Sequence, residues 1–155
     1  MPYLEPELVV QRFGSYLHTD VRDAIDDDRQ FVHAQVGSMS SSLTFLAREL
    51  GGARVAINTQ RRALQTALEE VETALEERPE AHEEVLAAVE SARARLENAE
   101  GAPTAVEREV VGAANIVFES IRDELDGDQA RRARRPLYRF LDTRVQTQLD
   151  VLGRD

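Results

Sequence analysis

The stretch "VHAQVGSMSSSLTFLARELGG", Val32 to Gly52, carries the most regular apolar pattern in the chain. Its large apolar side chains are separated alternately by four and three residues, which is the spacing of one face of an α-helix. They are Val32, Val36, Met39, Leu43, Leu46 and Leu50. Two glycines follow directly, and glycine commonly ends a helix. The stretch therefore predicts a helix with one apolar face that stops at Gly51–Gly52.

The same spacing recurs along the rest of the chain, which predicts five more helices and no strands. The first begins at Glu5–Pro6 and ends at the three aspartates 26–28, and the third begins near Asn58–Thr59. The fourth begins at Pro79 and ends at Gly101. The expected core positions of these helices are Val9, Phe13, Leu17, Val21, Ile25, Leu64, Leu68, Val71, Leu75, Val85, Val89, Ala92 and Leu96.

The last two helices have their own signals. The sequence "TAVE", Thr104 to Glu107, predicts a capping box, in which a hydroxyl and a carboxylate satisfy free backbone amides at a helix start. The fifth helix then ends at Gly127. Its expected core positions, with those of the sixth helix, are Val106, Val110, Val117, Ile121, Leu125, Leu141, Val145, Leu149 and Leu152. We expect an all-α, single-domain bundle of about six helices over residues 1–155.

An internal duplication is one further possibility for the architecture. The segment Val36–Gly52 aligns with Val111–Gly127, with Val, Gly, Glu, Leu and Gly at matching places. Residues 5–77 and 79–152 would then be two three-helix repeats. Helical segments rich in Ala, Glu, Leu and Arg also match one another by chance, and the sequence alone leaves both explanations open.

Composition restricts the class of protein. The chain of 155 residues has no cysteine, which excludes disulfides and thiolate metal sites. Its 19 basic residues are all arginine, and 29 acidic residues give a net charge of −10. Acidic surfaces are typical of proteins from a saline cytoplasm, and a GC-rich genome also favours arginine, so the halophilic interpretation has an alternative. We expect a cytoplasmic protein that binds neither nucleic acid nor membranes, because it lacks a signal peptide or spanning segment and its charge repels phosphate.

One segment is rich in arginine, although the chain as a whole is acidic. The sequence "QARRARRPLYRF", Gln129 to Phe140, contains five arginines. On a helix Arg131, Arg135 and Arg139 share one stripe, which suits carboxylates or phosphates. Aspartates and glutamates lie directly upstream, so a solvated ion-pair network is the simpler interpretation, and a protein contact is the second. The candidate contact residues are Arg131, Arg132, Arg135, Tyr138 and Arg139.

A run of small polar residues lies in the middle of the second helix. The segment "GSMSSS", Gly37 to Ser42, allows close helix packing, which is its simplest role. Its hydroxyls can also line a polar cleft between the second and fifth helices. The candidate ligand-binding residues are His33, Ser38, Ser41, Ser42 and Asn115.

No signature of catalysis accompanies these features. His18, His33 and His82 belong to no metal-binding motif, and no phosphate loop or nucleophile elbow occurs. We therefore expect no enzyme activity, no cofactor and no metal.

The segments "FGSYLHTDVRDAI", Phe13 to Ile25, and "LTFLARELGG", Leu43 to Gly52, resemble a small all-helical family of unknown function. Members of this family are encoded beside aminoglycoside-phosphotransferase-like kinases and acyl-CoA dehydrogenases. The closing segment "FLDTRVQTQLDVL", Phe140 to Leu152, is similar to its last helix, although "GRD" replaces the family's Asn-Pro ending. The resemblance implies an accessory role beside a small-molecule kinase or an acyl-CoA enzyme.

These observations favour a non-catalytic protein that works by contact, as a homodimer or as an accessory subunit. The sixth helix supports this function, because Leu137 and Phe140 widen its apolar arc beyond what one neighbour covers. The alternative is a small-ligand-binding domain that uses the polar cleft.

Overall fold

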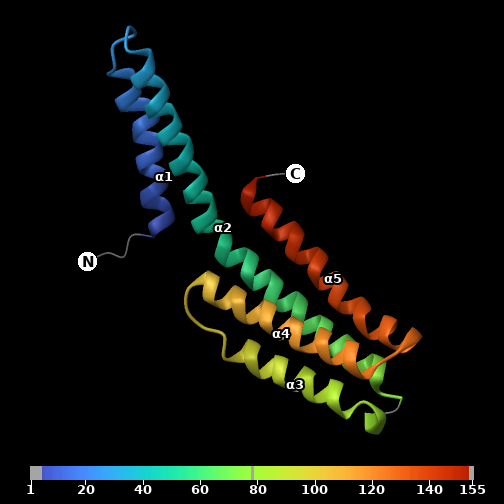
Figure 1. Ribbon diagram of the computed structural model, residues 1–155. Helices are drawn as coiled ribbons and strands as arrows, with labels where there is room; N and C mark the ends of the chain where they lie inside the picture. Colours follow the sequence, from blue (N-terminus) through green and yellow to red (C-terminus); the bar gives the residue numbers. More distant parts are fainter. Residues whose placement is uncertain (1–4, 78, 154–155) are drawn as a thin grey trace. The chain divides into compact units, whose positions relative to one another are not determined.

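The computed structural model describes residues 5–77 and 79–153, which are all-α (Figure 1). The described residues form five α-helices, with a π-helical segment after the first and a 3-10 turn before the third. The helices are α1 (Pro6–Tyr16), α2 (Gln30–Leu75), α3 (Glu83–Glu97), α4 (Pro103–Glu124) and α5 (Gly127–Leu152). Contacts divide the chain into two compact units. The first takes the residues up to Arg54 with those from Asp150, and the second takes Val55–Leu149.

Helix α2 is continuous through Gly51–Gly52, so the predicted stop there, with a separate third helix, is wrong. Both glycines stay in the helix, and neither has a positive φ angle. A glycine ends a helix only where the chain adopts the left-handed conformation, which glycine permits but does not require. Here a Cβ on Gly52 would lie 3.1 Å from Cγ2 of Val151. The missing side chain thus serves close packing at this point.

The first unit is a helical hairpin. Helix α1 runs antiparallel to the first part of α2, and the connection contains the three aspartates that were expected there (Figure 1). Gly14 lies against Ser40 and Thr44, and Glu7 lies against Gly51, which fixes the register of the two helices. In α2, Val36 and Ala47 are the buried apolar side chains of this unit.

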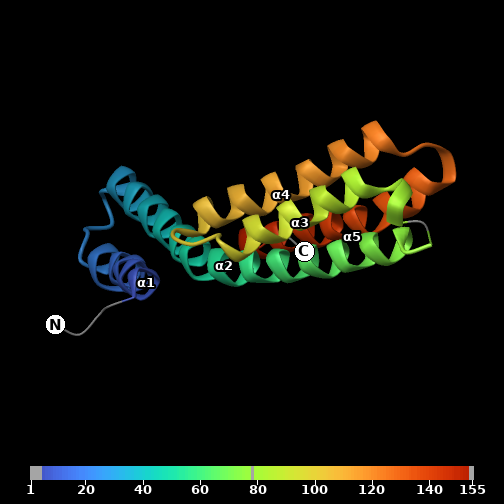
Figure 2. The same cartoon turned by 90° about the horizontal axis from the view of Figure 1, so that it is seen from below.

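The second unit contains the main hydrophobic core. Figure 2 shows the second part of α2 with α3, α4 and α5 gathered in one bundle. The predicted core positions from Leu64 to Leu96 are buried, as are Val110, Val117, Ile121 and Leu125. The remaining core side chains are Ile57, Ala67, Ala113, Ala114, Ala130, Ala133, Leu137 and Phe140.

The core face of α5 differs from the prediction. Leu141, Val145 and Leu152 are exposed, whereas the buried positions lie in the first half of the helix. Ala130 and Ala133 form part of this contact beside Leu137 and Phe140, and their small side chains allow close approach of α5 to its neighbours. Alanine adds little to an apolar pattern, so the predicted face followed the leucines and the valine of the second half of the helix.

The predicted boundaries of the fifth helix are also wrong. Helix α4 begins at Pro103 after Ala102, with no side-chain cap, so Thr104 lies inside the first turn and forms no capping box. A proline fits the first helical position because its φ angle is already helical and it needs no amide partner. Gly127 has a φ angle of 55° and begins α5, whereas α4 ends at Glu124.

The two expected repeats, 5–77 and 79–152, stay a prediction. The boundaries of the compact units do not coincide with them. The matched glycines also differ in their surroundings. A Cβ on Gly37 would meet nothing within 4 Å, whereas one on Gly112 would lie 2.7 Å from Cζ of Arg95.

Candidate functional site

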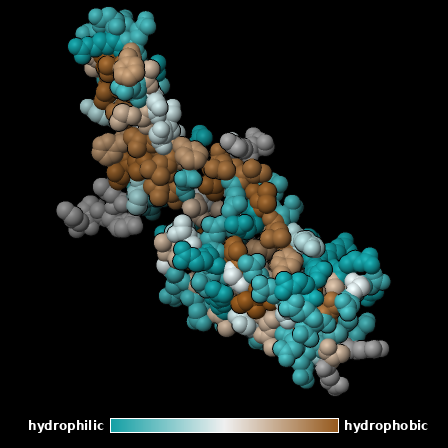
Figure 3. All heavy atoms as spheres, in the orientation of Figure 1, coloured by the Kyte–Doolittle hydropathy of each residue, from teal (hydrophilic) through white to brown (hydrophobic). Residues whose placement is uncertain are grey.

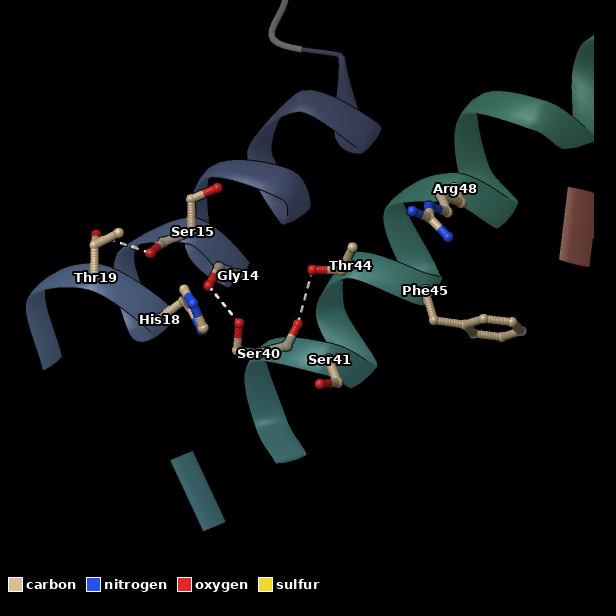
Figure 4. A pocket seen from close by; sticks show the side chains of 9 residues that line it. All are labelled: Gly14, Ser15, His18, Thr19, Ser40, Ser41, Thr44, Phe45 and Arg48. Carbon is tan, nitrogen blue, oxygen red and sulfur yellow. Dashed lines mark hydrogen bonds between the residues drawn. The ribbon is translucent and has the colours of Figure 1, made fainter. Parts of the chain in front are cut away.

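Helices α1 and α2 of the hairpin are in direct contact at Gly14 and Ser40. The Ser40 hydroxyl donates a hydrogen bond of 2.8 Å to the carbonyl oxygen of Gly14, and both residues are buried (Figure 4). A Cβ on Gly14 would lie 3.3 Å from Oγ1 of Thr44 and 3.4 Å from Cβ of Leu43. Small residues therefore join α1 to α2, which is the structural role that the serine stretch suggested.

A π-helical segment, Leu17–Val21, follows α1 directly. The amide of Arg22 bonds back five residues to the carbonyl of Leu17, which widens this turn. The Thr19 hydroxyl donates to the carbonyl of Ser15 at 3.0 Å (Figure 4). Single π turns within helices are frequent at functional sites, because they redirect the side chains that follow.

One side of the hairpin is an exposed apolar surface, which we call the apolar face. Its most exposed members are Phe13 at 60%, Met39 at 56% and Leu46 at 42%. Helical spacing and the antiparallel register place these side chains on the same side of the line where α1 meets α2. Figure 3 shows hydrophobic residues gathered over α1 and the adjoining part of α2. The face comprises Val9, Val10, Phe13, Leu17, Val32, Met39, Leu43, Leu46 and Leu50.

The other side of the hairpin contains a pocket of about 470 Å³, which we call the polar pocket (Figure 4). His18 and Arg48 supply its ionisable groups, and the Phe45 ring at its edge points away from α1. The Ser41 hydroxyl donates to its own helix, at the carbonyl of Gly37, so its lone pairs remain available as acceptors. The lining residues are Gly14, Ser15, His18, Thr19, Ser40, Ser41, Thr44, Phe45 and Arg48.

The residues predicted for a ligand cleft lie in different places. Ser41 lines the polar pocket, and His33 donates to the carbonyl of Ile25 at 3.1 Å beside a second, shallower hollow. Ser42 donates to the carbonyl of Ser38 within α2. Asn115 is exposed on α4, in the second unit. The shared cleft stays a prediction.

The polar pocket is instead built mainly from residues that the sequence analysis did not select. Gly14, Arg48 and Phe45 carry no motif of their own, and they come together through a contact between residues 26 positions apart. A glycine at an inward position of an apolar-spaced helix was the one available signal, because it indicates close approach of another backbone.

The predicted contact residues on α5 are all exposed, and two of them form ion pairs. Arg131 pairs with Asp128 at 3.0 Å, and Arg139 pairs with Glu70 of α2. Tyr138 packs against Phe118, with ring centroids 5.6 Å apart. These pairs fit the ion-pair interpretation of the arginine-rich segment, and its role as a partner surface stays a prediction.

Ion pairs between helices add to the second unit. Arg95 donates from Nε to Glu109 at 2.5 Å, and this hydrogen bond lowers the pKa of the Glu109 carboxyl and raises the pKa of Arg95. Arg93 bridges Glu72 and Glu90, at 2.5 and 2.7 Å, and the hydrogen bond to Glu72 is the main cause of its raised pKa. These ion pairs are partly exposed, and they join α3 to α2 and to α4 where the helices pack together.

A buried polar group lies at His82, just before α3. The side-chain amide of Gln129 donates to Nε2 of His82 at 2.5 Å, which links the start of α3 to the start of α5. Within residues 5–77 and 79–153, no three His, Asp or Glu side chains gather as metal ligands. None of the described helices combines the length and apolarity that crossing a membrane requires.

In comparisons with family models, curated proteins and solved structures, no match to this chain was found.

Proposed function

We propose that this protein acts by protein–protein contact, as a homodimer or as an accessory subunit, and that the apolar face of the hairpin makes the contact. The observation that carries the proposal is the exposure of Phe13, Met39 and Leu46 on one side of a hairpin. Isolated apolar residues are ordinary on protein surfaces, but a contiguous apolar surface marks an interaction site.

The distribution of apolar residues between the two units supports this function. Among the described residues, the second unit buries twenty core side chains, so its helices are covered by one another. The hairpin buries few apolar side chains and leaves Phe31 and Tyr16 exposed as well. The helices of the second unit therefore cover one another, whereas the hairpin leaves apolar side chains uncovered. An uncovered apolar surface is typical of a surface that binds a partner.

Neighbouring residues provide a matched test. Leu46 and Phe45 are adjacent on α2 and similarly exposed, at 42% and 44%, but only Leu46 belongs to the apolar face. A tagged protein is expressed in its own cells together with an untagged copy of the chain. We expect Leu46→Asp to lose the proteins, including the untagged copy, that co-purify with the unmodified chain, and Phe45→Asp to retain them. Equal co-purification with all three baits would contradict the proposed function.

A second candidate function is the binding of a small anionic molecule in the polar pocket. The observation in its favour is the presence of Arg48 and His18 around one hollow, because a guanidinium and an imidazole suit a small molecule with an acidic group. Thermal-shift measurements against nucleotides and acyl-CoA compounds, which carry acidic groups, test this function. We expect a stabilising ligand to lose its effect with Arg48→Ala. No shift with any compound would rule the candidate out for these classes.

A further inference from the structure

We infer that the partner on the apolar face is a second copy of this chain, and that two hairpins pack face to face as an intermolecular four-helix bundle. The inference rests on the proposed function and names the partner of the same surface.

The hairpin has the apolar side chains that are expected of one layer of a helix bundle. Helices form stable domains as packed layers around a shared core, and two helices alone provide a single layer. Among the described residues of the first unit, Val36 and Ala47 are the only ones with a buried hydrophobic side chain. The apolar side chains of the face are sufficient in number to fill a core once a second layer covers them.

The spacing of the face fits a helical partner layer. In α2 the face positions Val32, Met39, Leu43, Leu46 and Leu50 follow a seven-residue pattern of apolar side chains. This pattern forms the seam between helices in bundles and coiled coils. Helix α1 adds Phe13 beside this seam. A twofold axis makes such a face complementary to itself, because each copy offers both helices of an antiparallel pair.

Charge favours a second copy over an oppositely charged partner. The chain has a net charge of −10, so two copies repel each other over most of their surface. The apolar face has no ionisable side chain, and the α2 positions beside it include the uncharged Gln35 and Ser42. A docking surface for a basic partner would instead display the carboxylates that are abundant elsewhere on this chain.

The area is close to that of a stable dimer. With the exposed fractions of Phe13, Met39, Leu46 and Leu50, and half-buried neighbours, the face offers on the order of 600 Å² per copy. A standard interface covers about 800 Å² per partner, and the surrounding rim supplies the difference.

The test is the mass of the purified full-length chain in solution, measured by light scattering during gel filtration at about 100 μM, well above the micromolar range of weak dimers. We expect twice the chain mass of 17.4 kDa. Leu46→Asp is expected to give the single-chain mass, and Phe45→Asp is expected to remain a dimer. Circular dichroism of both variants checks that helix content is unchanged, since both side chains are exposed.

The possible outcomes separate the inference from the proposed function. A single-chain mass for the unmodified protein, or a dimer that Leu46→Asp leaves intact, would overturn the inference. If the purified chain is a monomer but a different protein co-purifies from cells in a Leu46-dependent manner, the inference of a second copy as partner is wrong. The proposed function of protein–protein contact is then retained. If Leu46→Asp changes neither measurement, both are wrong. Should Leu46→Asp lose helix content, Met39→Gln provides the milder polar change.

Discussion

The hydroxyl of Ser40 on α2 donates a hydrogen bond to the backbone carbonyl of Gly14 on α1, where the two helices of the hairpin are in direct contact. The hydroxyl is buried, and the glycine has no side chain that would hold the helices apart. This contact sets the register of the hairpin and therefore positions both the apolar face and the polar pocket.

Replacing Ser40 by Ala should destabilise the hairpin by about 1 kcal/mol, the usual contribution of one buried hydrogen bond. Ser41→Ala is the matched control, because Ser41 is exposed and donates within its own helix. Amide hydrogen exchange of α1 measures the local stability. We expect faster exchange in α1 for Ser40→Ala and little change for Ser41→Ala, and equal exchange in both would show that the contact contributes nothing.

Alanine substitutions at Gly37 and Gly112 should have different effects on the melting temperature. Alanine stabilises a helix interior by roughly 0.5–1 kcal/mol relative to glycine. At Gly37 nothing opposes this gain, whereas at Gly112 a Cβ would displace the guanidinium of Arg95 from its position beside Glu109. Thermal unfolding followed by circular dichroism should show a rise for Gly37→Ala and a smaller rise, or none, for Gly112→Ala. A larger rise for Gly112→Ala would contradict the packing described for Arg95.

The ion pair between Arg95 and Glu109 predicts a pH dependence. The pKa of Glu109 is lowered in the folded protein by the hydrogen bond from Arg95, so the unfolded chain binds a proton more readily. The stabilisation is present at neutral pH and is lost as pH falls below about 4.5 and through the lowered folded pKa. Urea midpoints should differ between the unmodified protein and Glu109→Gln at pH 7, and the difference should shrink as pH falls below about 4.5. A difference that stays constant as pH falls through the acidic range would exclude the carboxylate as its cause.

The excess of acidic residues predicts that salt stabilises the protein. Raising KCl from about 0.1 M to about 1 M shortens the screening length from about 10 Å to about 3 Å, which weakens repulsion among like charges. We expect the melting temperature to rise, and a saline cytoplasm is the setting that this behaviour suits. The control is replacement of the three exposed aspartates 26–28 by Asn, which should reduce the dependence on salt. A melting temperature unaffected by salt would argue for genome composition as the source of the arginine and aspartate content.

The helical class and most of the core of the second unit were predictable from the sequence. Large apolar side chains such as Leu68, Val89 and Val117 recur at helical spacing, and their burial requires only a neighbouring helix. The core positions in α5 were not predictable in this way, because Ala130 and Ala133 are buried by the packing of neighbouring helices and carry little apolar signal of their own.

The helix boundaries and the position of the candidate site could not be predicted, because they depend on contacts between residues that are far apart in the sequence. Gly51 and Gly52 have the residue type of a helix end, but whether they end α2 depends on what packs against them. The stripe from Val32 to Leu50 correctly predicted one apolar face on α2. It did not indicate that α1 covers only part of that face, and this incomplete coverage is the basis of the proposed function.

The π turn at Leu17–Val21 has a consequence for the evolution of the hairpin. Such a turn contains one residue more than a regular α-helical turn. Inserting a single amino acid into a regular helix would produce the same arrangement. It lies after Gly14, so loss of one residue from it would restore regular pitch while leaving the earlier helix and its contact with Ser40 in place. Loss of one residue here is therefore compatible with the same contact between α1 and α2.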